Sequence, residues 1–136
     1  METRVIRVHT GSRRLADLTG ELEAFCEDKG DGLCSVFAPH ATAGLALMET
    51  GSGSEADLEE ALLRLLPRDG RYRHAHGSAG HGADHLLPVL VPPSLVVPVL
   101  GGLPQLGTWQ RLVLVDTNAD NPDRQVRFSF LPANGG

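Results

Sequence analysis

The sequence predicts an α+β fold in which a mostly antiparallel sheet packs against two main helices. Three observations predict this class: short apolar runs with the period of a strand, two segments with the period of an amphipathic helix, and connections too short for parallel crossovers. Strand and helix patterns do not alternate, which argues against a βαβ repeat. The 136 residues have the usual length of one domain, so we expect a single domain over residues 1–136, with a frayed tail from about residue 132.

Runs of apolar residues predict the strands. The expected strands span residues 3–8, 33–39, 43–48, 95–100, 111–116 and 126–131. In the second strand, Cys34, Val36 and Ala38 fall on one face because successive side chains point to opposite sides. The two cysteines form no CxxC motif, so we expect Cys26 and Cys34 to be reduced residues of the core.

Two segments predict helices. The first runs from a cap at Asp17 or Thr19 to about residue 28, because its apolar residues recur on one helical face. The second spans residues 54–66; it opens with an S-x-x-D capping box and ends before a proline.

Residues 68–84 form a long segment rich in glycine and histidine, which predicts a loop. Loops of this length within compact domains are usually functional or disordered, and the histidines favour function. Residues 85–91 fit either a loop or a short helix, because Pro88 interrupts the pattern.

Composition and charge exclude several classes of function. The formal net charge is −5, and the arginines are scattered, whereas nucleic-acid binding requires a cationic stripe. The N-terminus carries charges where a secretory signal would be apolar. No stretch reaches the roughly 20 apolar residues of a membrane span. These features predict a cytoplasmic protein that binds neither nucleic acid nor membrane.

Histidine is the strongest candidate for chemistry, since four of the six histidines lie in the long loop or directly after it. His74-x-His76 places two imidazoles on one side of an extended segment, and His81-x-x-x-His85 places two on one face of a helix. Neither pair matches HExxH or a zinc-finger spacing. A single histidine in such a segment is typical of an ordinary surface residue, and only the clustering indicates a metal or proton-transfer site. The spacing leaves open whether His76 and His81 take part.

Further candidates lie outside this cluster. His40 follows a strand, where rigid backbone can aim it at a cleft. Glu49 is either a partner or general base for such a site or an exposed charge at a strand end. Trp109 is either an anchor of the core or an interface, or a wall that stacks on a flat ligand, with Gln110 supplying hydrogen bonds. The sequence has no GxSxG, P-loop or GxGxxG motif.

These residues belong to a combination of motifs by which the chain resembles the YjbQ family, also called secondary thiamine-phosphate synthases. The resemblance covers about residues 5–130. The motifs are H-A-T-A-G-L at 40–45 with Glu49, Y-x-H at 72–74, His85-Leu86, the segment from Ser94 to Val99, and L-G-T-W-Q at 106–110. One departure is His81, which stands where relatives often carry Asp or Asn.

The resemblance implies a site, an activity and an assembly. It implies that His40, His74 and His85 hold a divalent metal, zinc or alternatively magnesium, and act in catalysis together with Glu49. It places Thr42, Ser94, Trp109 and Gln110 around the bound substrate. The implied activity is a weak coupling of a pyrimidine pyrophosphate with a thiazole phosphate, in a homotrimer whose pocket lies near a subunit interface.

Two other functions fit the same residues. The first is a metal-dependent hydrolase or lyase that acts on another small metabolite. The second is a trimer that binds a metal or metabolite without turnover.

Overall fold

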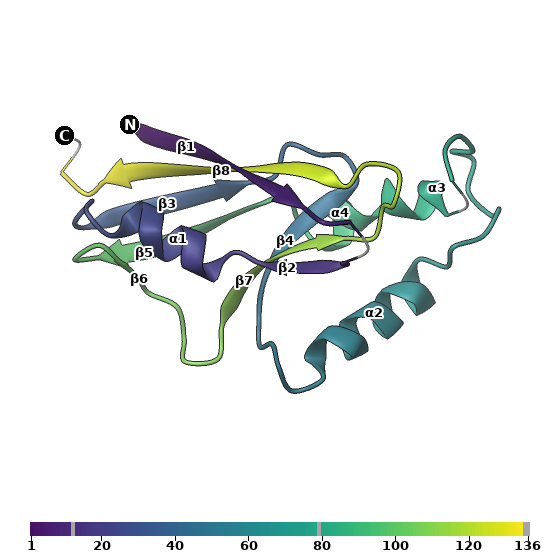
Figure 1. Cartoon of the computed structure of the whole chain (residues 1–136), viewed down its shortest axis with the longest axis horizontal. Helices are drawn as coiled ribbons and strands as arrows, with labels where there is room; N and C mark the ends of the chain where they lie inside the picture. Colours follow the sequence, from purple (N-terminus) through teal and green to yellow (C-terminus); the bar gives the residue numbers. More distant parts are fainter. Residues whose placement is uncertain (12, 79, 135–136) are drawn as a thin grey trace.

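The computed structural model describes residues 1–11, 13–78 and 80–134, which fold into two antiparallel sheets and four helices (Figure 1). The five-stranded sheet has the order β1 (Glu2–His9), β8 (Asp123–Pro132), β3 (Gly32–Phe37), β5 (Ser94–Leu100) and β6 (Leu103–Pro104). The three-stranded sheet has the order β2 (Leu15–Asp17), β7 (Arg111–Asp116) and β4 (Ala43–Met48). The helices are α1 (Thr19–Cys26), α2 (Ser54–Leu65), α3 (His81–Asp84) and α4 (Leu87–Leu90). The predicted α+β class with two main helices is confirmed.

Strand β7 lies at the centre of the packing, because side chains on both of its faces are buried. Leu112 and Leu114 face the larger core, which fills the space between the two sheets and α1. Val113 and Val115 face a smaller core beneath α2 and α4, which contribute Leu62 and Leu87. A strand buried on both faces carries a continuous apolar run, as the sequence RLVLVD does. The fold therefore has layers on both sides of the smaller sheet.

The two main helices and the strands differ from the predictions chiefly at their ends. Helix α1 ends at Cys26, two residues before the predicted end. Helix α2 has no capping box: Gly53 is its N-cap, Ser54 already lies inside the helix, and no side chain caps it. The carboxylate of Glu55 instead accepts the N–H of Gly51 at 3.0 Å. The capping-box prediction was therefore wrong, because the glycine-rich turn brings Glu55 back to the preceding backbone.

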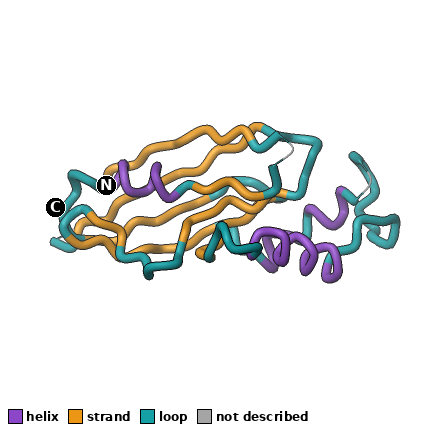
Figure 2. The backbone as a smooth tube through the Cα atoms, turned by 60° about the horizontal axis from the view of Figure 1, so that its bottom comes forward, coloured by secondary structure: helices purple, strands orange, loops and turns teal. Residues whose placement is uncertain are grey.

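The predicted long loop contains a helix, α3, and the ambiguous segment after it forms α4, with Pro88 in its first turn. Proline is tolerated there because the first N–H groups of a helix have no intrahelical acceptor. Strands β2 and β6 were not predicted. Together, α2, α3 and the histidine-rich segment lie at the end of the molecule away from both chain termini (Figures 1 and 2).

Both cysteines belong to the larger core, as predicted. Cys26 and Cys34 are free thiols and fully buried. Burial raises the pKa of the Cys34 thiol to about 12, which keeps it protonated and unreactive.

The predicted fraying of the chain from about residue 132 falls partly on residues 135–136, which lie outside the described part of the chain. Strand β8 extends to Pro132, and the N–H of Ala133 donates to the carbonyl of Asp31 at 3.0 Å. Among the described helices, none has the length and apolar character that crossing a membrane requires.

The close approach of β4 to the segment before β5 gives a test of the fold. A methyl group at Gly44 would overlap with the carbonyl of Val91. The two segments are also joined at the next residue of each, where the N–H of Leu45 donates to the carbonyl of Pro92. Gly44→Ala should therefore lower the free energy of unfolding by about 2 kcal/mol or more, as overpacking of a tight contact does. Urea denaturation measures this change.

Gly20→Ala is the matched control, because nothing lies within 4 Å of a Cβ at this position in α1. Alanine is the better helix former, so this variant should be as stable as the wild type or up to about 1 kcal/mol more stable. Equal stability of Gly44→Ala and the wild type would contradict the packing of β4 described above.

Candidate metal centre

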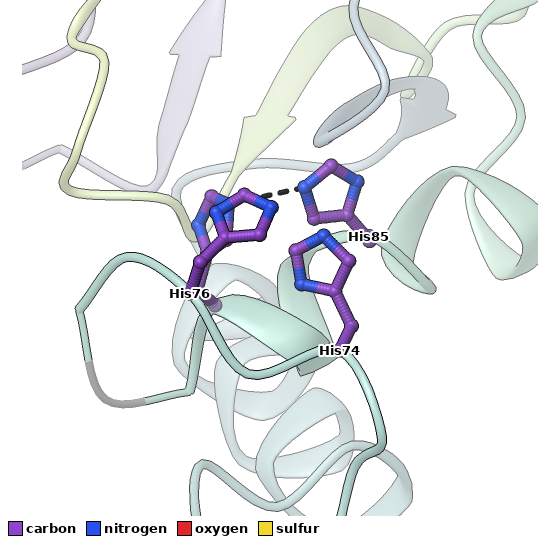
Figure 3. Close-up of side chains that lie close together, drawn as sticks. His74, His76 and His85 are labelled. Carbon is purple, nitrogen blue, oxygen red and sulfur yellow. Dashed lines mark hydrogen bonds between the residues drawn. The ribbon is translucent and has the colours of Figure 1, made fainter.

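Four imidazoles converge at the end of the molecule formed by α3 and the segment before it. His74, His76, His81 and His85 each offer a ring nitrogen, and these four atoms all lie within 4.8 Å of one another. Figure 3 shows the rings of His74, His76 and His85 turned toward a common space. We call these four residues the imidazole cluster.

Helix α3 positions half of the cluster. It carries His81 at its start and His85 at its C-cap, four residues apart and therefore on one helical face. The Nε2 atoms of the two rings lie 3.0 Å apart. Two ring nitrogens approach this closely either through a shared proton or when both face a common ion.

The other half of the cluster depends on a tight contact with α3. A Cβ at Gly82 would lie 2.8 Å from the carbonyl oxygen of His74 and closer still to the Cβ of Tyr72. Only glycine allows the two segments to pack at this distance. The hydroxyl of Tyr72 donates to the carbonyl of Pro67 at 2.6 Å, which fixes the same segment from its other side. The His74 ring consequently lies 4.2 Å from the His85 ring, measured between centroids.

A carboxylate lies behind His81. Its Nδ1 atom is 3.1 Å from Oδ2 of Asp120, which also accepts the N–H of Ser78 at 3.0 Å. The contact is close but not aligned as a hydrogen bond, so Nδ1 is a buried side-chain nitrogen without a hydrogen-bond partner in the described residues. Metal-bound histidines normally donate their second nitrogen to such a carboxylate.

A second, fully buried carboxylate supports the base of the cluster. Asp84 accepts hydrogen bonds from both Nη atoms of Arg68 and from Oγ1 of Thr117. Its Oδ2 lies 4.0 Å from Nδ1 of His81. The Arg68 guanidinium compensates the charge of this buried carboxylate.

The surroundings of His74 and His85 favour the neutral forms of these two imidazoles. Burial lowers the pKa of His85, with further contributions from the nearby His74, His81 and His76, while Asp84 opposes the shift. The pKa of His74 is lowered by burial and by His76 and His81. A neutral imidazole has a free lone pair, which is the form that binds a metal.

The cluster passes a test of fit for a tetrahedral metal. Four nitrogens at about 2.0 Å from a zinc ion would lie about 3.3 Å from one another. The separation of His81 and His85 is already close to this value, and the widest separation in the cluster requires only a modest contraction. All four donors are imidazoles, which suit zinc, copper, iron and nickel, whereas magnesium prefers oxygen ligands.

An open pocket of about 250 Å³ adjoins the cluster. It is lined by the cluster residues His74, His76 and His81 and by neighbours that include Asp69, Tyr72 and Ser78. Ligand pockets usually measure about 300–1,000 Å³, so this one suits a small molecule or a phosphate-sized part of a larger one.

The structure does not bring His40 into the cluster. Its Nε2 accepts the backbone N–H of Gln125 at 2.9 Å, in the loop region between β3 and β4. The same nitrogen also lies 3.1 Å from the carbonyl oxygen of Gln125. Since the main-chain N–H of Gln125 can only donate, Nε2 must be the acceptor and therefore carries no proton. Burial lowers the pKa of His40, and the charge of Arg124 lowers it further. His40 is thus a neutral imidazole whose lone pair is already occupied.

Thr42 belongs to a buried polar network. Its hydroxyl oxygen accepts hydrogen bonds from Nη2 of Arg124 at 2.8 Å and from Nδ2 of Asn118 at 3.2 Å. Arg124 also donates to both carboxylate oxygens of Asp116, at 2.7 and 2.9 Å, and Thr10 donates to the same carboxylate. These contacts connect β8, β7 and the loop before β4, so Thr42 contributes to structure at this point.

The remaining predicted site residues lie apart from the cluster. Glu49 directly follows β4 and is exposed, as is Ser94, the first residue of β5. Trp109 lies in the turn between β6 and β7 and is 73% exposed, so it is not a core residue. The side chain of Gln110 closes this turn by accepting the N–H of Gly107 at 2.8 Å.

The sequence analysis placed His74 and His85 in one site and left His76 and His81 open, and the structure brings all four together. Asp120 was only one of several carboxylates farther along the chain that could have been a partner of the histidines. The i, i+2 and i, i+4 spacings were the signals for the two histidine pairs. Asp120 had no local signal, because it lies 42 residues from Ser78, the neighbour whose N–H it accepts.

Comparisons with known proteins identify the family. The family model described as "UPF0047 protein YjbQ-like" matches residues 4–133. This chain therefore belongs to the YjbQ family, as its motifs predicted.

Individual relatives agree with this assignment. UPF0047 protein Rv2556c of Mycobacterium tuberculosis is 64% identical over 131 residues, which cover 96% of this chain and 98% of that protein. The crystal structure of APE1520 from Aeropyrum pernix K1 matches with a TM-score of 0.86 and 33% identity, over 97% of this chain and 99% of the other. The conserved hypothetical protein TT1486 from Thermus thermophilus matches with a TM-score of 0.82 and 29% identity, over 94% and 99% of the two chains.

Proposed function

We propose that this protein is a metal-dependent enzyme that acts on a small phosphorylated metabolite, with the imidazole cluster as its metal site. The observation that carries the proposal is the convergence of four ring nitrogens within 4.8 Å. The all-nitrogen donor set favours zinc over magnesium. When bound, such an ion supplies Lewis-acid chemistry, either by polarising a substrate oxygen or by lowering the pKa of water.

The chain's own residues would bind and orient the substrate beside this ion. The adjoining pocket accepts a group of phosphate size. Asp120 would hold His81 in the tautomer that points Nε2 at the ion, since its carboxylate faces Nδ1. The ion pair between the buried Asp84 and the partly buried Arg68 would keep α3 in place while the substrate exchanges.

The family resemblance suggests the specific reaction: coupling of a pyrimidine pyrophosphate with a thiazole phosphate to give thiamine phosphate. The charges near the pocket suggest that this reaction is slow. Arg68 already pairs with Asp84, and Arg71 pairs with Asp69 at 2.8 Å, so a pyrophosphate would have to compete for both cations. We therefore propose it as a secondary activity of a site adapted to another phosphorylated metabolite.

The reaction can be tested with the zinc-loaded protein and the two precursors. We expect thiamine phosphate to form with a turnover below about 1 s⁻¹, the lower end for ordinary enzymes. His85→Ala should abolish the product, and His9→Ala should not change it, because His9 lies outside the cluster and pairs with Asp123. Absence of thiamine phosphate from the wild type would remove this reaction from the proposal, and a panel of phosphate esters and lactones would then test for a hydrolase or lyase.

Metal binding without turnover is a second candidate, and the number of donors favours it. Structural zinc sites are closed by four protein ligands, whereas catalytic zinc sites keep one position open. A cluster of four imidazoles can close its own site. Whether the fourth position opens therefore distinguishes the two functions.

The ligand set can be tested by elemental analysis of single variants. We expect the wild type to bind one zinc ion per chain and His40→Ala to retain it, because Nε2 of His40 already accepts a hydrogen bond. His85→Ala should weaken zinc binding by more than the roughly 10- to 100-fold that loss of an outer contact costs. Loss of zinc from His40→Ala with retention by His85→Ala would instead support the ligand set that the resemblance implies.

We also propose that the chain assembles as a homotrimer, as the resemblance implies, through the outer face of the five-stranded sheet. Strands β3, β5 and β8 carry apolar side chains on this face, although a solvated face is normally polar. They are Leu33, Phe37, Val96 and Leu131, which are 43–58% exposed. The register places Leu33 opposite Leu131, and Phe37 opposite Ser94, so the predicted site residue Ser94 lies on the same surface.

Light scattering at micromolar concentration tests this assembly. The wild type should have three times the 14.5 kDa mass of the chain. Phe37→Lys combined with Val96→Lys should yield monomers, because it would bury two charges in the interface. Leu65→Lys, at an exposed position of α2, is the control and should stay trimeric. A wild type that is monomeric at these concentrations would refute the assembly.

A further inference from the structure

The four imidazoles are not held equally, and the difference follows from their surroundings. His81 is buried and His85 is half-buried, whereas His74 and His76 both reach the surface. Of these two, His74 is the more enclosed within the cluster. His76 is therefore the ligand closest to solvent.

Three of the ligands have a fixed backbone or a second contact. His81 and His85 are joined by α3, where the N–H of His85 donates to the carbonyl of His81 at 3.3 Å. His81 also has Asp120 behind its ring. The backbone of His74 is packed against Gly82.

His76 follows this anchored segment and lies at the margin of the cluster. Its ring centroid is 4.0 Å from that of His74, 5.1 Å from that of His81 and 6.2 Å from that of His85. The 6.2 Å value is the longest of the ring separations within the cluster. His76 also lines the open pocket, together with His74 and His81.

We propose that His76 is a displaceable ligand, so that the site alternates between a closed set of four imidazoles and an open set formed by His74, His81 and His85. An oxygen of an anionic ligand such as phosphate would take its place. In this exchange one metal–nitrogen bond breaks and one metal–oxygen bond forms; each donor supplies its own electron pair, and no oxidation state changes. The inference rests on the proposed metal site and specifies how that site admits a substrate.

With this exchange, a site that has four potential protein ligands can still bind a substrate, although four ligands are typical of structural zinc sites. The closed state satisfies the ion when no substrate is present. The open state has the three protein ligands and one exchangeable position that are typical of catalytic zinc sites. His76 would then compete with the substrate, and removing it should make anions bind more readily.

Cobalt(II) provides a direct readout, because its visible absorption reports the number and type of ligands independently of activity. The probes are the wild type, His76→Ala, His76→Gln and His85→Ala, each titrated with cobalt and then with inorganic phosphate. His76→Ala and His76→Gln should bind one cobalt ion with affinity reduced by about 10- to 100-fold, the range for loss of a supporting contact. His85→Ala should bind more weakly still.

The phosphate titration separates this inference from the proposed metal site. Phosphate should change the cobalt spectrum of His76→Ala at a concentration at least tenfold lower than for the wild type, because no imidazole competes. His9→Ala, with an exposed histidine outside the cluster, should match the wild type throughout. Two results would overturn the inference while leaving the metal site intact. In the first, His76→Ala loses as much cobalt affinity as His85→Ala does. In the second, phosphate changes the cobalt spectra of His76→Ala and the wild type at the same concentration. A wild type that binds no cobalt would refute the metal site, and the inference with it.

Discussion

The contact between Gly82 and the backbone of residues 72–74 determines the geometry of the whole site. The carbonyl of His74 lies so close to Gly82 that no larger residue fits there. This contact joins the His74-x-His76 pair to the His81 and His85 pair on α3. Without it the two pairs would remain separate, and neither could complete a four-coordinate site on its own. The cluster is thus a product of backbone packing, which a glycine makes possible.

Around this contact, the surroundings restrain the four imidazoles to different degrees. Asp84, the fully buried last residue of α3, accepts hydrogen bonds from the partly buried Arg68 and Thr117. Asp120 approaches His81 from a loop that is distant in the sequence. His76 lies at the opposite extreme, beside the open pocket. Such a gradient is what a binding site needs if it is to hold an ion firmly and still admit another ligand.

Long strands could be predicted from the sequence, and very short strands could not, because only long strands show a period. Strands β4 and β7 were predicted with their observed ends, because their apolar runs are continuous and their neighbours are turn residues. Strands β2 and β6, with three and two residues, are too short to show a period.

In the candidate site, features set by neighbouring residues in the sequence could be predicted, and features set by tertiary packing could not. The spacing of each histidine pair is local and was legible in the sequence. The convergence of the two pairs and the approach of Asp120 depend on tertiary packing, which leaves no local pattern. The position of His40 after a strand made it a candidate, and the resemblance added it to the metal ligands. In the fold its Nε2 is directed to the backbone of Gln125.

X-ray absorption at the zinc edge of the loaded protein would show whether the four imidazoles bind a single metal ion. In the absence of phosphate, we expect a single shell of four nitrogens at about 2.0 Å with the outer-shell scattering of imidazole rings. A shell dominated by oxygen, or one with at most one imidazole per zinc, would contradict it.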